Sequence, residues 1–299
     1  MNVLITGGAG FIGSALTDAL CLAGHTVTPL DNLSVPSRRP SRKGLVVRDV
    51  RSLTARDLDG IDTVVHLAAL KSVPASFEVG GFEHNVAVDR HVLHTFVDST
   101  ARRLLLASSC EVYGEQQGPL AETAPYAPRS PYAAGKVATE QLADIYRPRL
   151  DDERQIGIVR FFNTFGPHEN ADAVVPAFLD AVAEDRPLVI EGDGRQARDL
   201  TYIDDSVTML TRVLAAPALL PVINCGSGQA VSVLDLAHAV IRAAGRGTTT
   251  HTAARRNEIS SFTADMGLFH RAYGAVARTP LEEALALSIQ TRTPALTAA

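Results

Sequence analysis

The sequence has no long hydrophobic run, no basic cluster and few cysteines, and each absence excludes a class of protein. Apolar runs such as residues 104–107 are far too short to span a bilayer. The 28 basic and 33 acidic residues give a net charge of −5, without the footprint of a nucleic-acid-binding protein. The three cysteines are scattered, which excludes a disulfide scaffold and structural zinc and indicates a reducing compartment. We therefore expect no nucleic acid, membrane or metal as a partner.

The first residues resemble the start of a fold rather than a targeting segment. Met1 leads directly into a strand-like stretch, without the basic and apolar regions of a signal peptide. We therefore expect no secretory signal and a cytoplasmic location. The 299 residues, 46% of them hydrophobic, are enough for one large domain or two modest ones. An enzyme or a binding domain remains.

Short apolar segments alternate with amphipathic segments through the first half of the chain. We expect helices over 12–23, 82–100 and 131–146, and strands over 2–6, 26–30, 45–48, 63–67, 104–107 and 156–161. Strands that are apolar throughout are typical of a sheet covered on both faces, and the alternation predicts a doubly wound, mostly parallel α/β sheet. After Gly166 the pattern is less regular. We expect a first domain over 1–166 and a smaller mixed α/β lobe over 167–299, with the chain crossing between them.

The segment TGGAGFIG follows the first strand and opens the first helix. Gly7, Gly10 and Gly13 permit a tight turn, the close approach of a pyrophosphate and close helix packing, while the helix N-terminus stabilises the phosphate charge. Asp31 ends the second strand, where a carboxylate can hold the adenine ribose and would repel a 2′-phosphate. The alternative is a structural turn with a capping Asp. This pattern predicts a Rossmann-type domain that binds NAD.

A second motif places Tyr132 and Lys136 four residues apart on a predicted helix. The two side chains share one helix face, so the ammonium can lower the pKa of the phenol from about 10 toward the working pH. Such a pair alone is usually a solvated surface pair. Here it follows a strand that ends at Ser109, and the sites of such sheets lie at the carboxyl ends of the strands.

Together these motifs resemble the extended short-chain dehydrogenase/reductases that act on nucleotide sugars, over nearly the whole chain. The matching pieces are TGGAGFIG, Asp31-Asn32-Leu33, residues 66–69, Ser109 with Tyr132-x-x-x-Lys136, residues 160–163, residues 192–204 and Arg256-Asn-Glu258. The resemblance implies NAD as the cofactor and a nucleoside-diphosphate sugar, most simply a UDP-sugar, as the substrate. It also implies transient oxidation at sugar C4 and a homodimer formed by helices 82–100 and 131–146.

The resemblance also assigns roles to single residues. It implies that Tyr132 is the base at the C4 hydroxyl, that Lys136 supports it and that Ser109 binds the same oxygen. The implied cofactor-binding residues are Gly7, Gly10, Phe11, Ile12, Gly13, Asp31, Asn32, Ser34, Asp49, Val50, Leu67, Ala68, Ala69, Tyr132 and Lys136. The implied substrate contacts are Lys71, Asn163, Val175, Arg198 and Arg256. Lys71 is nearly as well explained as a surface lysine, and His66 is better explained as a packed, hydrogen-bonded residue than as a base.

Within this family the two residues after the catalytic Ser or Thr set the reaction. Epimerases usually carry small, non-acidic residues there, 4,6-dehydratases carry Asp-Glu and nucleotide-glucuronate decarboxylases carry Ser-Glu. This chain has Cys110-Glu111. Glu111 can accept the C5 proton once C4 is a ketone, and a thiol with a pKa of about 8.5 can protonate the departing C6 hydroxyl. The alternative for Cys110 is a small buried apolar residue behind the site.

The string SCEVYG, with residues 70–74 and the SPYAA block, looks most like the UDP-N-acetylglucosamine 5,6-dehydratases of tunicamycin biosynthesis. The chain departs from them at Gly135, where Ser is usual, and in its short C-terminal tail. The alternatives are a UDP-hexose 4-epimerase, then a nucleotide-glucuronate decarboxylase or a 4,6-dehydratase. A catalytically silent NAD sensor is a further alternative. Glu111 argues against the epimerase, and the intact Ser-Tyr-Lys set argues against the sensor.

Overall fold

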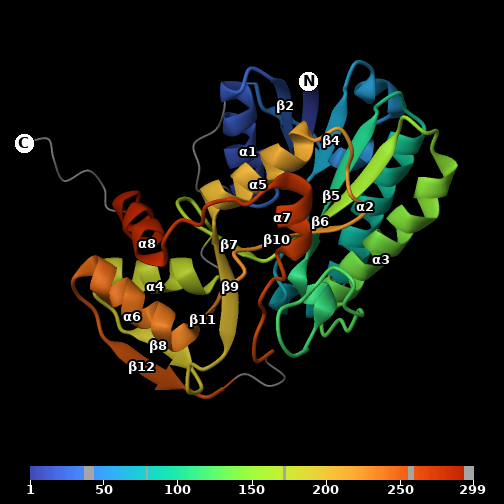
Figure 1. Cartoon of the computed structure of the whole chain (residues 1–299). Helices are drawn as coiled ribbons and strands as arrows, with labels where there is room; N and C mark the ends of the chain where they lie inside the picture. The colour runs from blue at the N-terminus through green and yellow to red at the C-terminus, as the bar shows by residue number, and fades with distance from the viewer. Residues whose placement is uncertain (37–43, 79, 171–172, 255–258, 293–299) are drawn as a thin grey trace, which may run out of the picture.

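The computed structural model describes residues 1–36, 44–78, 80–170, 173–254 and 259–292. The chain forms a large lobe around a parallel sheet and a smaller lobe beside it (Figure 1). The predicted substrate contact Arg256 lies outside the described residues. Among the residues that are described, no helix is long and apolar enough to cross a membrane.

The large lobe is built on seven strands in the order β10-β6-β5-β4-β1-β2-β3, and each adjacent pair is parallel. This is the doubly wound α/β sheet that the sequence predicts. The strands are β1 (Asn2–Thr6), β2 (Thr26–Asp31), β3 (Val46–Val47), β4 (Thr63–His66), β5 (Arg103–Ser109), β6 (Gln155–Phe161) and β10 (Ile223–Cys225).

Helices cover both faces of this sheet. One face carries α1 (Phe11–Leu22) and α5 (Ile203–Ala215), which pack against each other. The other face carries the paired helices α2 (Gly81–Val97) and α3 (Pro131–Tyr146), seen to the right of the sheet in Figure 1. Short 3-10 helices join these elements: η1 (Val50–Ser52), η2 (Ala55–Leu58), η3 (Pro74–Phe77), η4 (Cys110–Tyr113) and η5 (Arg147–Arg149).

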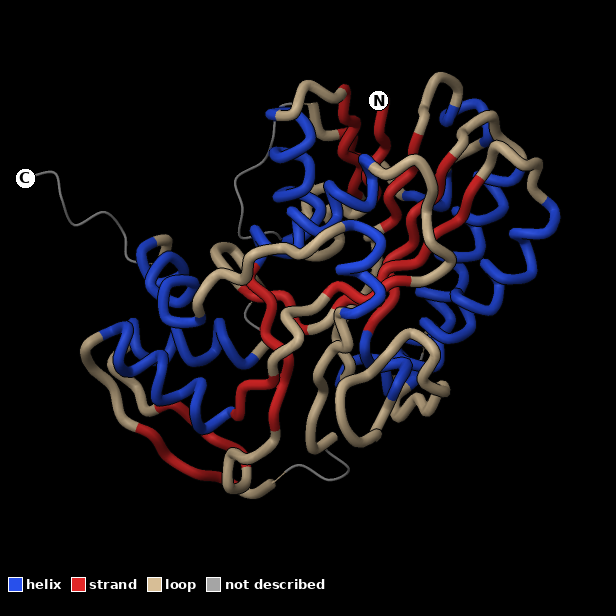
Figure 2. Tube along the Cα trace, viewed as in Figure 1, coloured by secondary structure: helices blue, strands red, loops and turns tan. Residues whose placement is uncertain are grey.

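The smaller lobe consists mainly of helices packed on short strands (Figure 2). Its elements are α4 (Val174–Ala183), β8 (Leu188–Glu191), α6 (Val233–Ala244), β12 (Thr249–Thr252) and α8 (Leu281–Gln290). A three-stranded sheet of β11 (Ala230–Ser232), β9 (Ala197–Tyr202) and β7 (Asn163–Phe165) joins the lobes, and α7 (Gly267–Tyr273) packs near β10. Because β10 and α5 follow Gly166 yet belong to the large lobe's layers, a division at 166 stays a prediction.

Alternate residues of the strands enter two separate hydrophobic clusters. Val3 and Ile5 of β1 pack into the cluster that contains Leu16 of α1, whereas Leu4 packs into the cluster that contains Val92 of α2. Successive side chains of a strand point to opposite faces, so a sheet covered on both sides needs apolar residues at every position. This explains the unbroken apolar runs in the sequence.

Two glycines beside the catalytic elements should respond oppositely to substitution by alanine. Gly135 lies inside α3, where an added Cβ would meet the Phe82 ring at 3.5 Å, an ordinary contact. Gly114 has φ of +60°, and a Cβ there would lie 1.8 Å from the Ala127 carbonyl oxygen. We expect Gly135→Ala to raise the free energy of unfolding by about 0.5–1 kcal/mol, because glycine weakens a helix interior. Gly114→Ala should lower it by at least about 2 kcal/mol.

Denaturant unfolding of both variants measures the two changes. A change of the same sign in the free energy of unfolding of both variants would contradict this account of the packing at α3 and η4.

Candidate active site

The glycine-rich turn between β1 and α1 packs so closely against the protein's own backbone that it has no room for a Cβ atom. Gly7 has φ of +71°, and a Cβ there would lie 2.8 Å from the Ala68 backbone nitrogen. A Cβ at Gly13 would lie 2.1 Å from the Gly7 carbonyl oxygen, which also accepts a hydrogen bond from Gly10 N at 3.0 Å. Only glycine therefore fits the turn that aims the N-terminus of α1 outward, and such a turn suits a pyrophosphate.

Asp31, at the end of β2, is tied to this turn. Its carboxylate accepts hydrogen bonds from Ala9 N at 3.1 Å and Leu33 N at 2.8 Å. Asn32 follows, and its side-chain oxygen accepts from Ser34 N at 3.0 Å. The carboxylate thus stands beside the turn, as an adenine ribose partner must. The Asp31 carboxylate and the glycine turn together fit NAD.

The other predicted cofactor residues adjoin the ends of the same strands. Leu67, Ala68 and Ala69 follow β4, and the backbone of Leu67 and Ala68 lies where a Cβ added at Gly7 would clash. Asp49 caps η1 and binds Arg51 through both oxygens, and these bonds hold the pKa of Asp49 well below its usual range. The Val50 side chain is buried in the core, so a contact from Val50 to a cofactor would have to come from its backbone.

The catalytic residues come from β5 and α3. Ser109 is the last residue of β5, and its hydroxyl accepts from Glu111 N at 3.2 Å. Tyr132 and Lys136 lie in the first turns of α3, which is started by Pro131 and by the Ser130 hydroxyl, an acceptor from Ala133 N at 3.1 Å. Tyr132 and Ser109 share a hydrogen bond. The structure therefore brings together the three residues that the sequence singles out.

The net pKa of Tyr132 runs against the sequence expectation. Burial raises it above its ordinary value, and the Lys136 ammonium and the hydrogen bond to Ser109 oppose this. The expected influence of Lys136 is present, but desolvation of the phenolate exceeds it. The sequence pattern contains no measure of burial, so the net direction could not be read from it.

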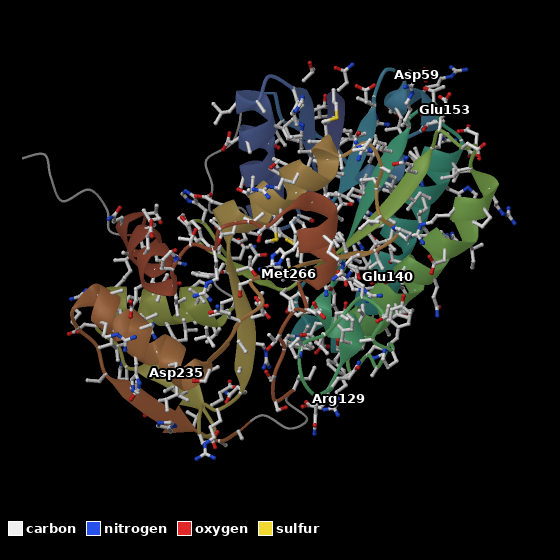
Figure 3. The ribbon with its side chains drawn as sticks, in the orientation of Figure 1. Asp59, Arg129, Glu140, Glu153, Asp235 and Met266 are labelled. Carbon is white, nitrogen blue, oxygen red and sulfur yellow. The ribbon has the colours of Figure 1, made fainter. Side chains whose placement is uncertain are left out.

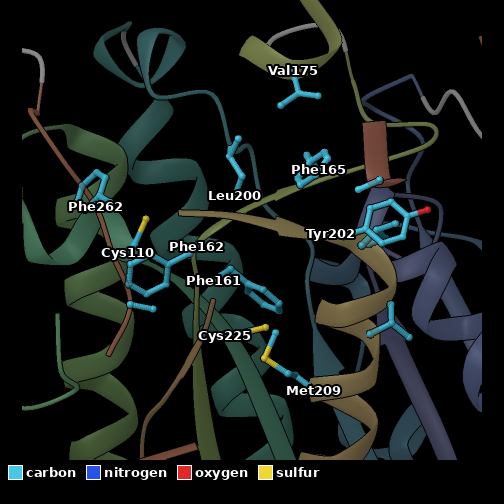
Figure 4. Close-up of a cluster of buried hydrophobic side chains, with 14 of the residues drawn as sticks. Cys110, Phe161, Phe162, Phe165, Val175, Leu200, Tyr202, Met209, Cys225 and Phe262 are labelled. Carbon is cyan, nitrogen blue, oxygen red and sulfur yellow. The ribbon is translucent and has the colours of Figure 1, made fainter. Parts of the chain in front are cut away.

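Cys110 and Glu111 both lie in a poorly solvated part of the site. Cys110 is 3% exposed and belongs to the large hydrophobic cluster that also includes Phe162 and Phe262 (Figure 4). Burial and the charge of Glu111 raise the pKa of this thiol well above its ordinary value, so it stays protonated at neutral pH. Burial also raises the pKa of Glu111, against the influence of Arg198. A carboxylate with a raised pKa is a stronger base.

The predicted substrate contacts are spread around this site. The Arg198 guanidinium lies over the Phe262 ring at 5.5 Å from its centroid. Its charge acts to lower the pKa of both Cys110 and Glu111, but burial has the larger effect and both pKa values are raised. Asn163 at the start of β7 and Lys71 beyond β4 are exposed. The Val175 side chain is 2% exposed and packs in the core, so a substrate could meet only its backbone. The roles of these residues stay predictions.

The sequence pattern missed Asp89, which lies directly behind Lys136. Asp89 is fully buried, and its Oδ2 lies 3.2 Å from Lys136 Nζ while its Oδ1 lies 2.9 Å from His66 Nε2. The packed, hydrogen-bonded His66 agrees with the expectation for that residue. A signal was present, since Asp89 falls on the apolar stripe of α2 with Val92 and Phe96. A carboxylate on such a stripe needs a buried partner.

A second buried ion pair fixes α3 against the sheet. Glu140, labelled in Figure 3, lies 2.7 Å from Arg160 Nη2 of β6 and accepts a hydrogen bond from the Ser108 hydroxyl. The Arg160 guanidinium stacks over the Tyr113 ring at 4.8 Å. Because Ser108 precedes Ser109, this pair fixes β5 and α3 at the position where Ser109 meets Tyr132. Among the described residues, no group of three or more His, Cys, Asp or Glu could hold a metal ion.

Comparisons with known proteins agree with this geometry. Residues 3–226 match the model of the NAD dependent epimerase/dehydratase family. The chain is 32% identical over 274 residues to an uncharacterized UDP-glucose epimerase, YtcB, of Bacillus subtilis, and the match covers 84% of each chain.

Solved structures extend the likeness to the whole chain. It is similar to TunA, an NAD-dependent NDP-hexosamine 5,6-dehydratase of tunicamycin biosynthesis, with a TM-score of 0.92, 39% identity and coverage of 98% of this chain and 97% of TunA. It is similar to MoeE5 in complex with UDP-glucuronic acid and NAD, with a TM-score of 0.88, 34% identity and coverage of 98% and 99%. The chain therefore belongs to the NAD-dependent epimerase/dehydratase family, and it is an enzyme that acts on nucleotide sugars with NAD as its cofactor.

Proposed function

We propose that this enzyme is a dehydratase that removes water across C5 and C6 of a UDP-sugar of the N-acetylglucosamine type. The observation that carries the proposal is Glu111, a half-buried carboxyl with a raised pKa, two residues from Ser109. An epimerase needs no base beyond Tyr132. An enzyme that must remove a C5 proton needs a second one, and Glu111 supplies it.

The first stage oxidises the sugar at C4. Tyr132 takes the proton of the C4 hydroxyl while Ser109 holds the same oxygen, and Lys136 stabilises the phenolate. A bound NAD would supply the acceptor for the C4 hydride and the source for its return. The glycine turn, Asp31 and Lys136 would hold that cofactor. Because hydride and proton both return to C4, the whole cycle is redox-neutral.

The second stage eliminates water. The C4 ketone acidifies the C5 hydrogen, and Glu111 takes that proton. The electron pair of the C5–H bond forms the C5–C6 double bond while the C6–O bond breaks, and the Cys110 thiol protonates the departing oxygen to give water. Glu111 then returns its proton to the Cys110 thiolate, so both residues end as they began. The raised pKa of Cys110 supports its being protonated at the start.

Relatives supply further support. TunA is described as a 5,6-dehydratase of an NDP-hexosamine, and MoeE5 binds a UDP-sugar. A 4-epimerase is the second candidate, because the similar protein YtcB is described as a UDP-glucose epimerase. We also infer a homodimer through α2 and α3 and a cytoplasmic location.

Removal of the Tyr132 hydroxyl should abolish both candidate reactions. We expect Tyr132→Phe to lower kcat by about 10²–10⁴-fold, because the base at C4 is lost, and to leave NAD and UDP-sugar binding nearly unchanged. Tyr146→Phe, at the far end of the same helix, is the matched control and should keep its activity. Equal turnover in the two variants would show that Tyr132 is not the base.

Reaction in deuterium oxide separates dehydratase from epimerase. Glu111→Gln should still oxidise C4, so NADH accumulates on the enzyme, but it should incorporate no deuterium at C5. Cys110→Ala should keep C5 exchange and lose elimination, whereas the control Cys225→Ala, at an equally buried thiol of β10, should keep both. Exchange at C5 is read in the recovered substrate, because the 5,6-alkene product has no hydrogen at C5. A wild-type product that has lost no water and keeps its C5 hydrogen, with Glu111→Gln and Cys110→Ala both active, would identify an epimerase and refute the dehydratase.

The burial of Glu111 also predicts a pH-dependent stability. The pKa of Glu111 is higher in the folded than in the unfolded state, so the folded protein loses stability as the pH rises through this range. Glu111→Gln removes that loss. We expect it to melt above wild type at about pH 8, with the difference shrinking toward about pH 3, where Glu111 is protonated in both states. Calorimetry at the two pH values measures this, and a constant difference would contradict it.

A further inference from the structure

Five side chains form one connected chain of contacts beneath Tyr132. Lys136 Nζ lies 3.2 Å from Asp89 Oδ2, and Asp89 Oδ1 lies 2.9 Å from His66 Nε2. His66 Nδ1 lies 2.6 Å from the Thr6 hydroxyl, and the Thr139 hydroxyl donates to Asp89 Oδ2. The contacts thus run from the residue before the Gly7 turn to the lysine of the catalytic helix.

All five side chains are removed from water. Asp89 and Thr6 are fully buried, and His66, Lys136 and Thr139 are each 2% exposed. A lone ammonium in such surroundings tends to lose its proton, because burial penalises the charged form. Burial does lower the pKa of Lys136, but Asp89 raises it, and the net pKa lies above its ordinary value. Asp89 therefore compensates the burial of this charge.

The orientation of Asp89 is fixed from both sides. His66 of β4 binds one oxygen, and Lys136 and Thr139 of α3 share the other. The other titratable groups that act on the pair are Tyr132 and Glu140, both on α3. An ammonium has three donors, and Asp89 takes one of them. Two remain for the phenolate side of the site and for the cofactor.

We propose that Asp89 is a positioning residue of the reaction, which holds Lys136 as a charged ammonium beneath Tyr132 where water cannot reach it. The inference rests on the proposed roles of Tyr132 and Lys136. It differs from a merely structural role in one respect. A structural role needs a hydrogen-bonding shape, which Asn supplies, whereas the positioning role needs the negative charge.

The small number of lysines permits a direct test without substrate. The chain contains three, Lys43, Lys71 and Lys136, so protein labelled with ¹³C at lysine Cε gives three resonances, assigned with Lys43→Arg and Lys71→Arg. In wild type the Lys136 resonance should remain that of an ammonium up to about pH 9. In Asp89→Asn the midpoint of the Lys136 titration should fall by at least about two pH units, because a buried lysine without a partner has a lowered pKa.

The matched control is Asp205→Asn. Asp205 is also buried, at 7% exposure, and binds Thr279 in a part of the chain remote from α3. Its substitution should alter stability and leave the Lys136 titration unchanged. An equal Lys136 midpoint in wild type and Asp89→Asn would overturn the inference.

Kinetics provide the second readout. The rate at which NADH forms on mixing with UDP-sugar should fall by about 10²-fold or more in Asp89→Asn, and it should decline as the pH rises above Lys136's lowered midpoint. Wild type and Asp205→Asn should show no such alkaline decline. A lower rate with an unchanged pH profile would reduce Asp89 to a structural role. A wild type that forms no NADH with any UDP-sugar would contradict the proposed function, while the titration still decides the inference about Asp89.

Folding of the variant is itself informative. Should Asp89→Asn fail to fold, the double variant Asp89→Asn, Lys136→Met removes the unpaired ammonium, and its soluble, folded recovery would support the inference. A double variant that also fails to fold would contradict it, because the defect would then not come from the unpaired charge of Lys136.

Discussion

Charge buried along one face of α3 constrains the whole active site. Lys136 and Glu140 lie one turn apart on this helix, and both are almost completely shielded from water. A buried charge is tolerated only with a partner, so the helix must dock where Asp89 of α2 and Arg160 of β6 meet those side chains. This docking also sets Tyr132 against Ser109 at the end of β5. The geometry of the reaction is therefore a consequence of how two ion pairs are satisfied.

The parts of the fold set by local pattern could be predicted, and those set by pairing between distant segments could not. The predicted strands at β1, β2, β4 and β6 are close to the observed bounds, because a sheet covered on both faces demands apolar runs. At the edge of the sheet, the strand predicted over 45–48 is observed as β3, which has only two residues, both exposed. The parallel pairing of β8 with β12 joins segments about sixty residues apart, and no short pattern encodes it.

The residues of the active site divide in the same way, into those that a local pattern identifies and those that only contacts between distant segments reveal. The glycine turn, Asp31, Tyr132 and Lys136 have fixed spacings, so the sequence identifies them. Asp89 and the Glu140–Arg160 pair act through contacts between separate elements, and the net pKa of Tyr132 depends on burial, so these required the structure. Burial also explains why the pKa values of Cys110 and Glu111 differ from those of the same residues on a protein surface. The environment that penalises their ionised forms keeps the Cys110 thiol protonated and makes the Glu111 carboxylate a stronger base.

The identity of the product tests the central claim most directly. Purified enzyme incubated with UDP-N-acetylglucosamine should give a sugar nucleotide lighter by one water molecule. Its proton NMR spectrum should contain the signals of an exocyclic alkene at C6, and no NADH should be released. A product of unchanged mass with inverted configuration at C4 would contradict the account. In that case the site would be an epimerase, in which Glu111 removes no proton.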